Sequence, residues 1–267
     1  MEIYLRDEFE TLWRGKDPFV EVEKISGQIL RSKEGRITLQ FRLDGRGYFL
    51  KLHKGIGWRE IAKNLFQFRF PVLGAKNEQR ASLVLSQIGV GTLSVAAYGE
   101  KGVNPAQKAS FIITDAIEPS TSLEDVALQW RNYPPEPKLK RAVLRRVCEM
   151  THLMHANHIN HRDLYICHFL WRQYPGTSSN TSPDLALIDL HRALIHKKLP
   201  YRWRIKDLAS LYYSVMDEKL TVRERLRFIR EYSQKPLHRA LKEDAAMWMD
   251  VERKARKLHA KAIRKGI

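Results

Sequence analysis

The chain has 267 residues, of which 43% are apolar and 10% aromatic, so it can bury a sizeable core. This composition excludes a disordered chain, a collagen and a small fold stapled by disulfides. The 47 lysines and arginines outnumber the 30 acidic residues and give a formal net charge of +17. Such a charge predicts attraction to an anionic partner: nucleic acid, a membrane surface, a phosphorylated substrate or an acidic protein.

The cysteine content and the first residues bear on the compartment. Two cysteines, Cys148 and Cys167, are too few for a disulfide framework or a four-thiolate zinc site, which favours a reducing compartment. The N-terminal residues are charged and mixed, unlike a signal peptide, and no apolar run reaches the roughly 18 residues of a membrane span. We therefore expect a cytoplasmic protein, or one on the cytosolic face of a membrane.

The N-terminal half predicts an antiparallel sheet. Residues 36–43 alternate between apolar and polar side chains, which is typical of a half-buried strand. The Asp-Gly-Arg-Gly sequence at 44–47 is a strong signal for a hairpin turn. Together with short strands over 27–32 and 48–53, it predicts three consecutive strands joined by tight turns. The same patterns predict a helix over 76–87 that Gly89 ends, and strands over 93–98 and 110–114.

Two other stretches are rich in basic residues. Residues 55–70 interleave basic and apolar side chains, which predicts an amphipathic helical insert at the surface. We expect this insert to dock on an anionic membrane through Arg59, Lys63, Arg69, Trp58, Phe66 and Phe68. Residues 251–267 are either a solvated helix face or a further contact for an anionic partner.

The pattern becomes helical after Tyr133-Pro134-Pro135. Apolar residues follow the helical period over residues 139–154. Further helices are expected over residues 205–216, 221–233 and 236–263. Because the last strand of the sheet ends near residue 117, we place a β-rich N-lobe at 1–117 and a helical C-lobe at 118–267. This arrangement is an α+β class.

Two aspartates and a lysine are the sharpest chemical signal. His161-Arg162-Asp163 follows the long helix, and the apolar run 185–188 predicts a strand that delivers Asp189. Such a pair suits phosphoryl transfer, because one carboxylate accepts a hydroxyl proton and the other holds Mg²⁺ against nucleotide phosphates. Lys51 lies mid-strand between apolar neighbours, and Glu78 is a candidate partner that would position it on those phosphates.

Eight stretches carry a family resemblance: residues 11–17, 48–51, 71–75, 110–114, 159–163, 165–170, 188–193 and 202–208. They resemble the lipopolysaccharide core heptose(I) kinases of Gram-negative bacteria, a family with a protein-kinase-like fold. The resemblance covers nearly the whole chain, and the run around Asp163 and His168 is its most specific part.

The resemblance implies a bilobal fold and an ATP-dependent kinase that phosphorylates a heptose of the lipid-anchored inner core. It implies Asp163 as the catalytic base and Asp189 as the ligand of Mg²⁺. It also implies that Glu78 orients Lys51 on the nucleotide phosphates. The remaining nucleotide contacts that it implies are Gly35 in the nucleotide loop and the backbone of a hinge from Asp115 to Ile117.

Three positions depart from the general kinase pattern. The nucleotide loop has one glycine, Gly35, rather than three. His168 stands where the pattern H-R-D-x-x-x-x-N has asparagine, so we expect it to be a second metal ligand. An imidazole nitrogen suits Mg²⁺ less well than an amide oxygen does. Asp189 is followed by Leu-His instead of Phe-Gly, which gives less support to a regulated flip of this loop.

The expected partners are lipid-anchored inner-core lipopolysaccharide, the anionic surface of the inner membrane at its cytoplasmic face, and a small acidic protein such as acyl carrier protein. Two alternatives stay open. One is a kinase of the same fold with a protein Ser, Thr or Tyr acceptor. The other is a nucleic-acid-binding module driven by the basic charge, although no helix-turn-helix, zinc-finger or RNA-recognition signature is present and no nucleic acid is expected.

Several polar residues have simpler interpretations. Four histidines recur every third residue, as in a metal cluster, but the run crosses a helix end, which favours capping and packing: His152, His155, His158 and His161. Cys148 lies on an apolar helix face and is interpreted as core. Cys167 could act as a thiol nucleophile only with a nearby base and orienting group. Asp207 is interpreted as structural, capping its helix and bonding the catalytic-loop backbone.

Overall fold

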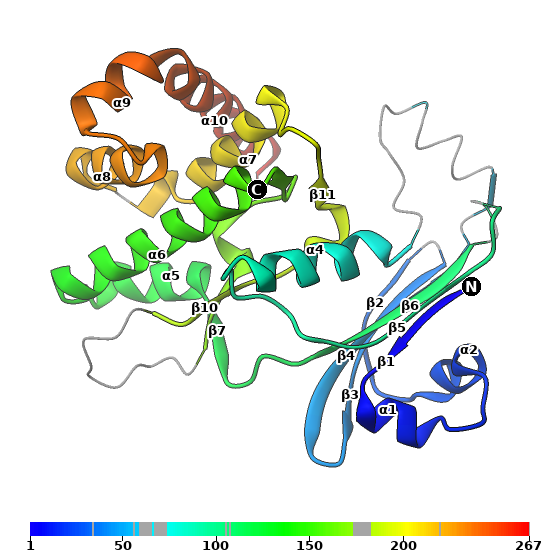
Figure 1. Cartoon of the computed structure of the whole chain (residues 1–267). Helices are drawn as coiled ribbons and strands as arrows, with labels where there is room; N and C mark the ends of the chain where they lie inside the picture. Colours follow the sequence, from blue (N-terminus) through cyan, green and yellow to red (C-terminus); the bar gives the residue numbers. More distant parts are fainter. Residues whose placement is uncertain are drawn as a thin grey trace. The chain divides into compact units, whose positions relative to one another are not determined.

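The structure, a computed structural model, describes residues 1–33, 35–55, 57–58, 66, 74–104, 106, 108–172, 183–218 and 220–266. The chain divides into two compact units, which Figure 1 shows coloured along the sequence. The first unit comprises Met1–Leu83 and Leu93–Glu118, and the second Val84–Thr92 and Pro119–Ile267. Within the described ranges, none of the helices combines the length and hydropathy that crossing a bilayer requires.

An antiparallel sheet forms the first unit. Its strands among the described residues are β1 (Glu2–Leu5), β2 (Gln28–Lys33), β3 (Arg36–Leu43), β4 (Arg46–Lys54), β5 (Val95–Lys101) and β6 (Ala109–Asp115). They lie in the order β1-β5-β6-β4-β3-β2, so the predicted three-stranded meander is confirmed as β2, β3 and β4. The predicted hairpin turn lies at Asp44 and Gly45, whose φ values of 48° and 78° are those of a type I′ turn.

Helices cover this sheet. The short helices α1 (Asp7–Leu12) and α2 (Pro18–Glu21) lie against one face (Figure 1). The core on that face includes Phe9, Trp13, Phe19, Val22, Leu39, Phe41, Leu50, Leu52 and Phe111. Because successive strand residues point to opposite faces, Lys51 points away from Leu50 and Leu52, toward the helix α4 (Lys76–Gln87).

The second unit is mainly helical. Its helices are α5 (Leu123–Asn132), α6 (Pro137–Ala156), α7 (Tyr201–Tyr213), α8 (Val222–Ser233), α9 (Leu237–Glu243) and α10 (Ala245–Lys265). Short strands β7 (Ser120–Ser122), β9 (Phe169–Arg172) and β10 (Leu185–Leu187) form one small sheet, and β8 (Ile159–Asn160) pairs with β11 (Leu194–Ile195). Side chains of α6, α7, α8 and α10 share one apolar core, including Cys148 as predicted.

The structure differs from one predicted helix and leaves a second mostly undescribed. The single helix predicted over 236–263 is wrong, because α9 and α10 are separate and meet at Asp244, which leaves helical geometry at φ −104° and ψ 13°. The Asp244 carboxylate binds Lys235 at 3.0 Å, and a short polar side chain of this kind competes with helix propagation. The predicted insert over 55–70 lies mostly outside the described residues, although Trp58 and Phe66 are described and exposed.

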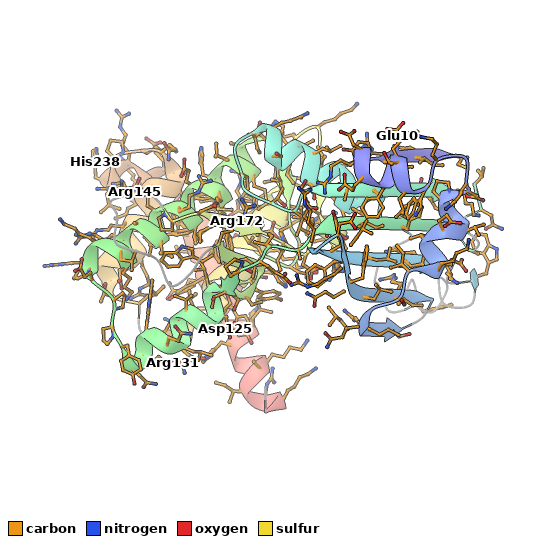
Figure 2. All side chains as sticks on the ribbon, turned by 90° about the horizontal axis from the view of Figure 1, so that it is seen from below. Glu10, Asp125, Arg131, Arg145, Arg172 and His238 are labelled. Carbon is orange, nitrogen blue, oxygen red and sulfur yellow. The ribbon has the colours of Figure 1, made fainter. Side chains whose placement is uncertain are left out.

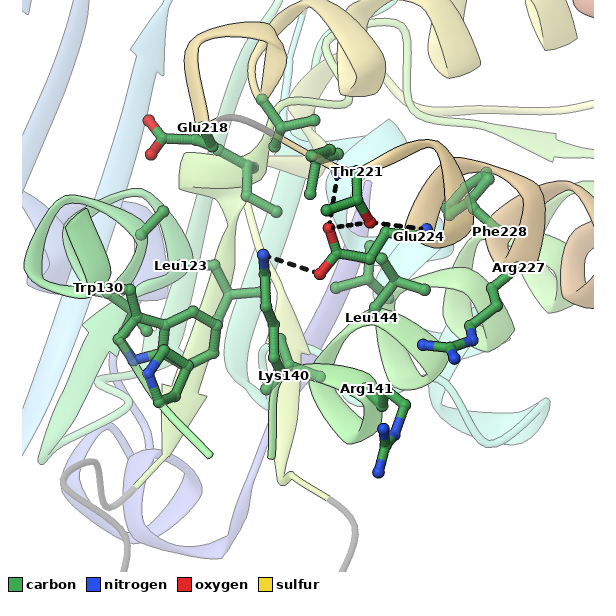
Figure 3. Close-up of a pocket in the computed structure, with 18 of the residues that line it drawn as sticks. Leu123, Trp130, Lys140, Arg141, Leu144, Glu218, Thr221, Glu224, Arg227 and Phe228 are labelled. Atoms are coloured by element: carbon green, nitrogen blue, oxygen red, sulfur yellow. Dashed lines mark hydrogen bonds and ion pairs between the residues drawn. The ribbon is translucent and has the colours of Figure 1, made fainter. Parts of the chain in front are cut away.

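A cavity of about 820 Å³ opens among α5, α6 and α8 in the second unit. Its lining is mainly apolar and includes Leu123, Trp130, Leu144 and Phe228 (Figure 3). Beside it, Lys140 binds Glu224 at 2.8 Å, and Glu224 closes a capping box with Thr221 at the start of α8. Arg141, Arg223 and Arg227 also line the cavity and have no carboxylate partner within the described part of the chain.

Candidate active site

A buried carboxylate holds the backbone of the His161-Arg162-Asp163 segment. Asp207 lies inside α7, is 0% exposed, and accepts hydrogen bonds from the main-chain N–H groups of His161 at 2.6 Å and Arg162 at 2.8 Å. Arg162 has a left-handed φ of 73°, which costs a non-glycine residue about 1 kcal/mol. The predicted contact between Asp207 and this backbone is confirmed, but the predicted cap is wrong because α7 begins at Tyr201.

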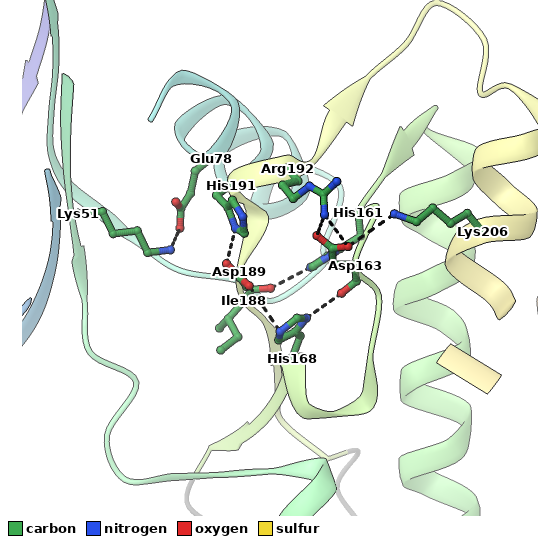
Figure 4. Close-up of polar contacts among 10 residues, drawn as sticks. All are labelled: Lys51, Glu78, His161, Asp163, His168, Ile188, Asp189, His191, Arg192 and Lys206. Atoms are coloured by element: carbon green, nitrogen blue, oxygen red, sulfur yellow. Dashed lines mark hydrogen bonds and ion pairs between the residues drawn. The ribbon is translucent and has the colours of Figure 1, made fainter. Parts of the chain in front are cut away.

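Asp163 is surrounded by cations. Its side chain is 17% exposed, and its carboxylate oxygens lie 2.8 and 3.0 Å from Nη1 of Arg192 (Figure 4). Nζ of Lys206, on α7, lies 3.5 Å from the same carboxylate. These contacts fix the direction of the carboxylate while leaving it partly accessible, as a group that accepts a hydroxyl proton must be.

Asp189 follows β10, as the apolar run predicted, and has a left-handed φ of 62°. Oδ1 of Asp189 lies 2.5 Å from Nδ1 of His191, and Oδ2 lies 3.5 Å from Nε2 of His168 (Figure 4). The second acid of the site is therefore placed between two imidazole rings.

A hydrogen bond to the main chain of Asp163 sets the tautomer of His168 when its ring is neutral. Nδ1 of His168 lies 2.7 Å from the main-chain oxygen of Asp163. Because a carbonyl oxygen only accepts, Nδ1 of the neutral ring carries the proton, and Nε2 is left to accept a hydrogen bond or to bind a metal. The same bond ties His168 to the residue that bears the other carboxylate.

The carboxylate of Asp189 and Nε2 of His168 are the groups that could hold a metal ion here. Proteins usually bind Mg²⁺ through one or two carboxylates together with substrate phosphates and water, and Asp189 fits that role. Over the described ranges, no group of three or more His, Cys, Asp or Glu side chains is arranged to hold a metal. The oxygen ligands of Asp189 fit a Mg²⁺ ion that takes its other ligands from a nucleotide and water.

A buried histidine connects the two acidic segments. His161 is 0% exposed, and burial lowers its pKa from the ordinary value of 6.5. Its Nε2 lies 2.9 Å from the main-chain oxygen of Ile188, so the neutral ring donates a hydrogen bond to the segment that carries Asp189. Its ring also stacks on His168, with centroids 5.5 Å apart.

In the first unit, Lys51 forms the ion pair that its spacing from Glu78 suggested. Nζ of Lys51 lies 2.6 Å from Oε1 of Glu78 (Figure 4), and the two side chains are 24% and 0% exposed. Oε2 of Glu78 has no hydrogen-bond partner among the described residues. A buried carboxylate that faces an ammonium group fixes its direction, because leaving either charge alone would be costly.

Gly35 lies in the turn between β2 and β3, where its backbone requires glycine. It has φ of 72°, and a Cβ atom there would lie 2.9 Å from the main-chain oxygen of Lys54. The N–H of Lys54 donates to the oxygen of Gly35 at 2.8 Å, so the two strands stay close at this end. The positive φ and the close approach of Lys54 therefore explain the glycine at this position without a ligand.

The expected hinge residues lie at the end of β6. The carboxylate of Asp115 accepts hydrogen bonds from Arg6 at 2.5 and 2.7 Å, and its N–H donates to the oxygen of Ser94 at 3.0 Å. These contacts position the backbone from Asp115 to Ile117 relative to the sheet. The Asp115 side chain is thereby occupied within the protein, which leaves main-chain atoms as the groups that a ligand could meet here.

Other residues that the sequence singled out lie in ordinary surroundings. Burial raises the pKa of Cys167 to about 11, so the thiol stays protonated at neutral pH and is a poor nucleophile. His155 binds the hydroxyl group of Tyr232 at 2.8 Å, and His152 binds its main-chain oxygen. The expected membrane-docking residues Arg59, Lys63, Phe68 and Arg69 lie outside the described residues.

Three residues of this site were not anticipated: His191, Arg192 and Lys206. Each is basic and lies within three positions of Asp189 or Asp207, which was the available signal. Their proximity to these aspartates along the chain does not show that Arg192 and Lys206 both reach Asp163. That convergence depends on how the segments fold together.

Comparisons with known proteins agree with one another on the family of this chain. Residues 20–232 match the model of the lipopolysaccharide kinase (Kdo/WaaP) family. The chain is 47% identical over 269 residues to lipopolysaccharide core heptose(I) kinase WaaP of Pseudomonas aeruginosa, covering 100% of this chain and 99% of the relative. It is 44% identical over 265 residues to the protein of the same name from Escherichia coli, covering 99% and 100%.

A solved structure of WaaP in complex with acyl carrier protein matches with a TM-score of 0.84 and 42% sequence identity. The match covers 97% of this chain and 100% of that one. The predicted α+β, protein-kinase-like fold is confirmed, and so is the predicted class of enzyme, a phosphotransferase that uses ATP. The chain belongs to the lipopolysaccharide kinase (Kdo/WaaP) family.

Proposed function

We propose that the chain transfers the γ-phosphoryl group of ATP to a heptose hydroxyl group of the lipopolysaccharide inner core. The observation that carries this proposal is 47% identity, over the full length, to a relative named as a heptose(I) kinase. Two accessible acids of the second unit, Asp163 and Asp189, support it because phosphoryl transfer requires a carboxylate near the acceptor hydroxyl and another for the metal.

Each unit has its own role in this proposal. The first unit is the nucleotide-binding lobe, in which Glu78 directs Lys51 toward the phosphates and the main chain of the β2–β3 turn at Gly35 contacts them. The backbone of Asp115 and Ile117 meets adenine. The second unit is the catalytic lobe.

In the second unit, Asp163 accepts the proton of the sugar hydroxyl group and aligns its oxygen for in-line attack. His191 holds the Asp189 carboxylate in direction through Oδ1, and Nε2 of His168 lies 3.5 Å from Oδ2. Bound to Asp189, Mg²⁺ would neutralise the phosphate charge of ATP, with Nε2 of His168 as a weaker additional ligand. The protein otherwise contributes position and electrostatics rather than covalent chemistry.

An acidic protein partner belongs to the same proposal. One structural neighbour is a complex with acyl carrier protein, an acidic protein that the positive charge of this chain would also attract. Arg141, Arg223 and Arg227 at the cavity of the second unit offer cations without a carboxylate partner in the described residues. The apolar lining of that cavity suits the acyl group that such a carrier bears (Figure 3).

We further propose that the enzyme acts at the cytoplasmic face of the inner membrane, where a lipid-anchored acceptor is presented. The C-terminal part of α10 supports this proposal. It projects from its unit in Figure 2 and carries exposed basic residues, namely Lys254, Lys257, Lys261, Arg264 and Lys265. Basic side chains near an anionic leaflet each contribute about 1 kcal/mol of binding.

The replacement Asp163→Ala tests the catalytic assignment. We expect transfer from radiolabelled ATP to dephosphorylated core lipopolysaccharide to fall at least about 100-fold, because a positioned base contributes roughly that much or more. Binding of ATP should stay nearly unchanged. The matched control is Asp184→Ala, which removes a carboxylate of the same unit that is 64% exposed.

Wild-type turnover in Asp163→Ala would refute the role of Asp163. Label in protein side chains, with none in the core saccharide, would instead replace the heptose acceptor by a protein acceptor. Equal losses in the Asp163 and Asp184 variants would point to general damage to the second unit.

A further inference from the structure

Three cations gather around one catalytic carboxylate. Arg192 and Lys206 contact Asp163 directly, at 2.8 and 3.5 Å. Arg162 is 9% exposed, its Nε has no hydrogen-bond partner in the described residues, and its guanidinium group lies 4.8 Å from the ring centre of Trp203. Lys206 also donates to the main-chain oxygen of Arg162.

This cluster carries an excess of positive charge. The carboxylates next to it are Asp163 and Asp207, and both oxygens of Asp207 already accept main-chain N–H groups. Three cations against two carboxylates leave one positive charge uncompensated in a partly buried region. Lys206 is only 25% exposed, and burial lowers its pKa from the ordinary value of 10.5. An arrangement of this kind is stabilised when an anion joins it.

The position of the cluster beside the Asp163 carboxylate indicates which anion it would bind. A hydroxyl oxygen that gives its proton to Asp163 must come within hydrogen-bond distance of the Asp163 carboxylate. Arg192 and Lys206 touch that same carboxylate, so a phosphoryl group bonded to the hydroxyl oxygen comes within reach of their nitrogens. The four residues between Asp163 and His168 are Leu, Tyr, Ile and Cys, so this loop supplies no cation of its own there.

We infer that Arg192 and Lys206 are further catalytic residues that hold the phosphoryl group during its transfer. The inference rests on the proposed function. In the step, a bond forms between the acceptor oxygen and the γ-phosphorus, and the bond from that phosphorus to the bridging oxygen breaks. The electron pair leaves with ADP, and the hydroxyl proton moves to Asp163. Arg192 and Lys206 stabilise the negative charge on the equatorial oxygens.

Steady-state kinetics of Arg192→Gln and Lys206→Met test this role. We expect kcat to fall about 100-fold, as when one preorganised donor is removed, while KM for ATP and for the acceptor changes less than about threefold. Lys206→Arg should recover part of the loss because it restores a cation. The control Lys198→Met removes an exposed lysine of the same unit and should behave as wild type.

A binding measurement distinguishes a lost catalytic contact from a misfolded variant. It uses ADP, Mg²⁺ and aluminium fluoride, and the aluminium fluoride imitates the phosphoryl group during its transfer. The two variants should bind ADP alone as wild type does, melt at the wild-type temperature, and lose most of the extra affinity that aluminium fluoride confers. Unchanged kcat, or unchanged affinity for the aluminium fluoride complex, overturns the inference. A rise in acceptor KM at constant kcat also overturns it, because the cluster would then bind a resting anionic group of the acceptor.

The proposed function fails separately from this inference. A wild-type protein that transfers no phosphate to core lipopolysaccharide would refute the heptose acceptor. The aluminium fluoride measurement needs no sugar, so it would still decide whether Arg192 and Lys206 contact the transferring group.

Discussion

Single buried residues determine much of the geometry of this site. The Asp207 carboxylate holds two consecutive N–H groups and so stabilises the left-handed backbone of Arg162, next to Asp163. His161, between the two acidic segments, donates to Ile188 from a fully buried ring. Replacement of either residue should therefore disturb the catalytic loop without removing a group that reacts.

His161 makes the stability of the protein depend on pH. Burial lowers its pKa in the folded state, so between that value and about 6.5 the unfolded chain binds more protons than the folded one. The free energy of unfolding should therefore fall as pH drops through about 6.5, by at most about 1.4 kcal/mol per pH unit from this group. Urea denaturation at neutral and mildly acidic pH measures the dependence.

The variant His161→Gln keeps a donor toward Ile188 but does not titrate. Its free energy of unfolding should vary less with pH than that of wild type. The exposed His238, replaced by Gln, serves as the control and should leave the wild-type dependence in place. If His161→Gln kept the full wild-type dependence, other groups would account for it.

At the scale of elements, α8 connects two features of the second unit. Its first turn is fixed by the reciprocal bonds between Thr221 and Glu224, and Glu224 also binds Lys140 of α6. The same helix carries Arg223 and Arg227 to the cavity. The capping box therefore sets the position of two of the cations that we assign to the acidic partner.

Charge reversal on α8 tests the partner assignment. We expect the double variant Arg223→Glu and Arg227→Glu to bind purified acyl carrier protein at least about tenfold more weakly by calorimetry, because mismatched charges at an interface repel. Arg239→Glu, an exposed change on α9, is the control. Equal affinity of the α8 variant and wild type would move the partner to another surface.

At the scale of the whole molecule, the excess of basic residues predicts association with anionic surfaces. The net charge of +17 is not confined to one site, but α10 concentrates exposed lysines at its C-terminal end. Electrostatic attraction between exposed charges weakens as salt shortens the screening length. Membrane binding of this protein should therefore be strong at low salt and weak at high salt.

Co-sedimentation with anionic vesicles tests the contribution of α10. We expect Lys257→Glu with Lys261→Glu to reduce binding at least about tenfold, since each basic residue near the surface contributes about 1 kcal/mol. Reversal of two exposed lysines elsewhere, Lys197 and Lys198, provides the same change of net charge. If both pairs reduced binding equally, net charge alone would govern the association and α10 would have no special role.

Periodicity and turn chemistry, which are local properties, predicted much of the architecture. Alternation defined β3, the Asp44-Gly45 turn defined the hairpin, and helical spacing gave α4 with the same bounds as the structure. The break at Asp244 was not predicted, because an apolar stripe can continue across a single residue that leaves the helix.

Motif spacing likewise predicted Asp163 and Asp189 as candidate acids from a few neighbouring residues. The order of one strand followed by one helix predicted the pairing of Lys51 with Glu78, which the structure contains. Only the tertiary structure decided which cations meet Asp163 and which imidazoles flank Asp189. Arg192 and Lys206 come from segments that the sequence does not relate to one another. Lys206 reaches Asp163 from α7, which meets this segment through Asp207, whereas Arg192 precedes β11, which pairs with β8 just before Asp163. Long-range packing of this kind leaves no periodic pattern in a single sequence.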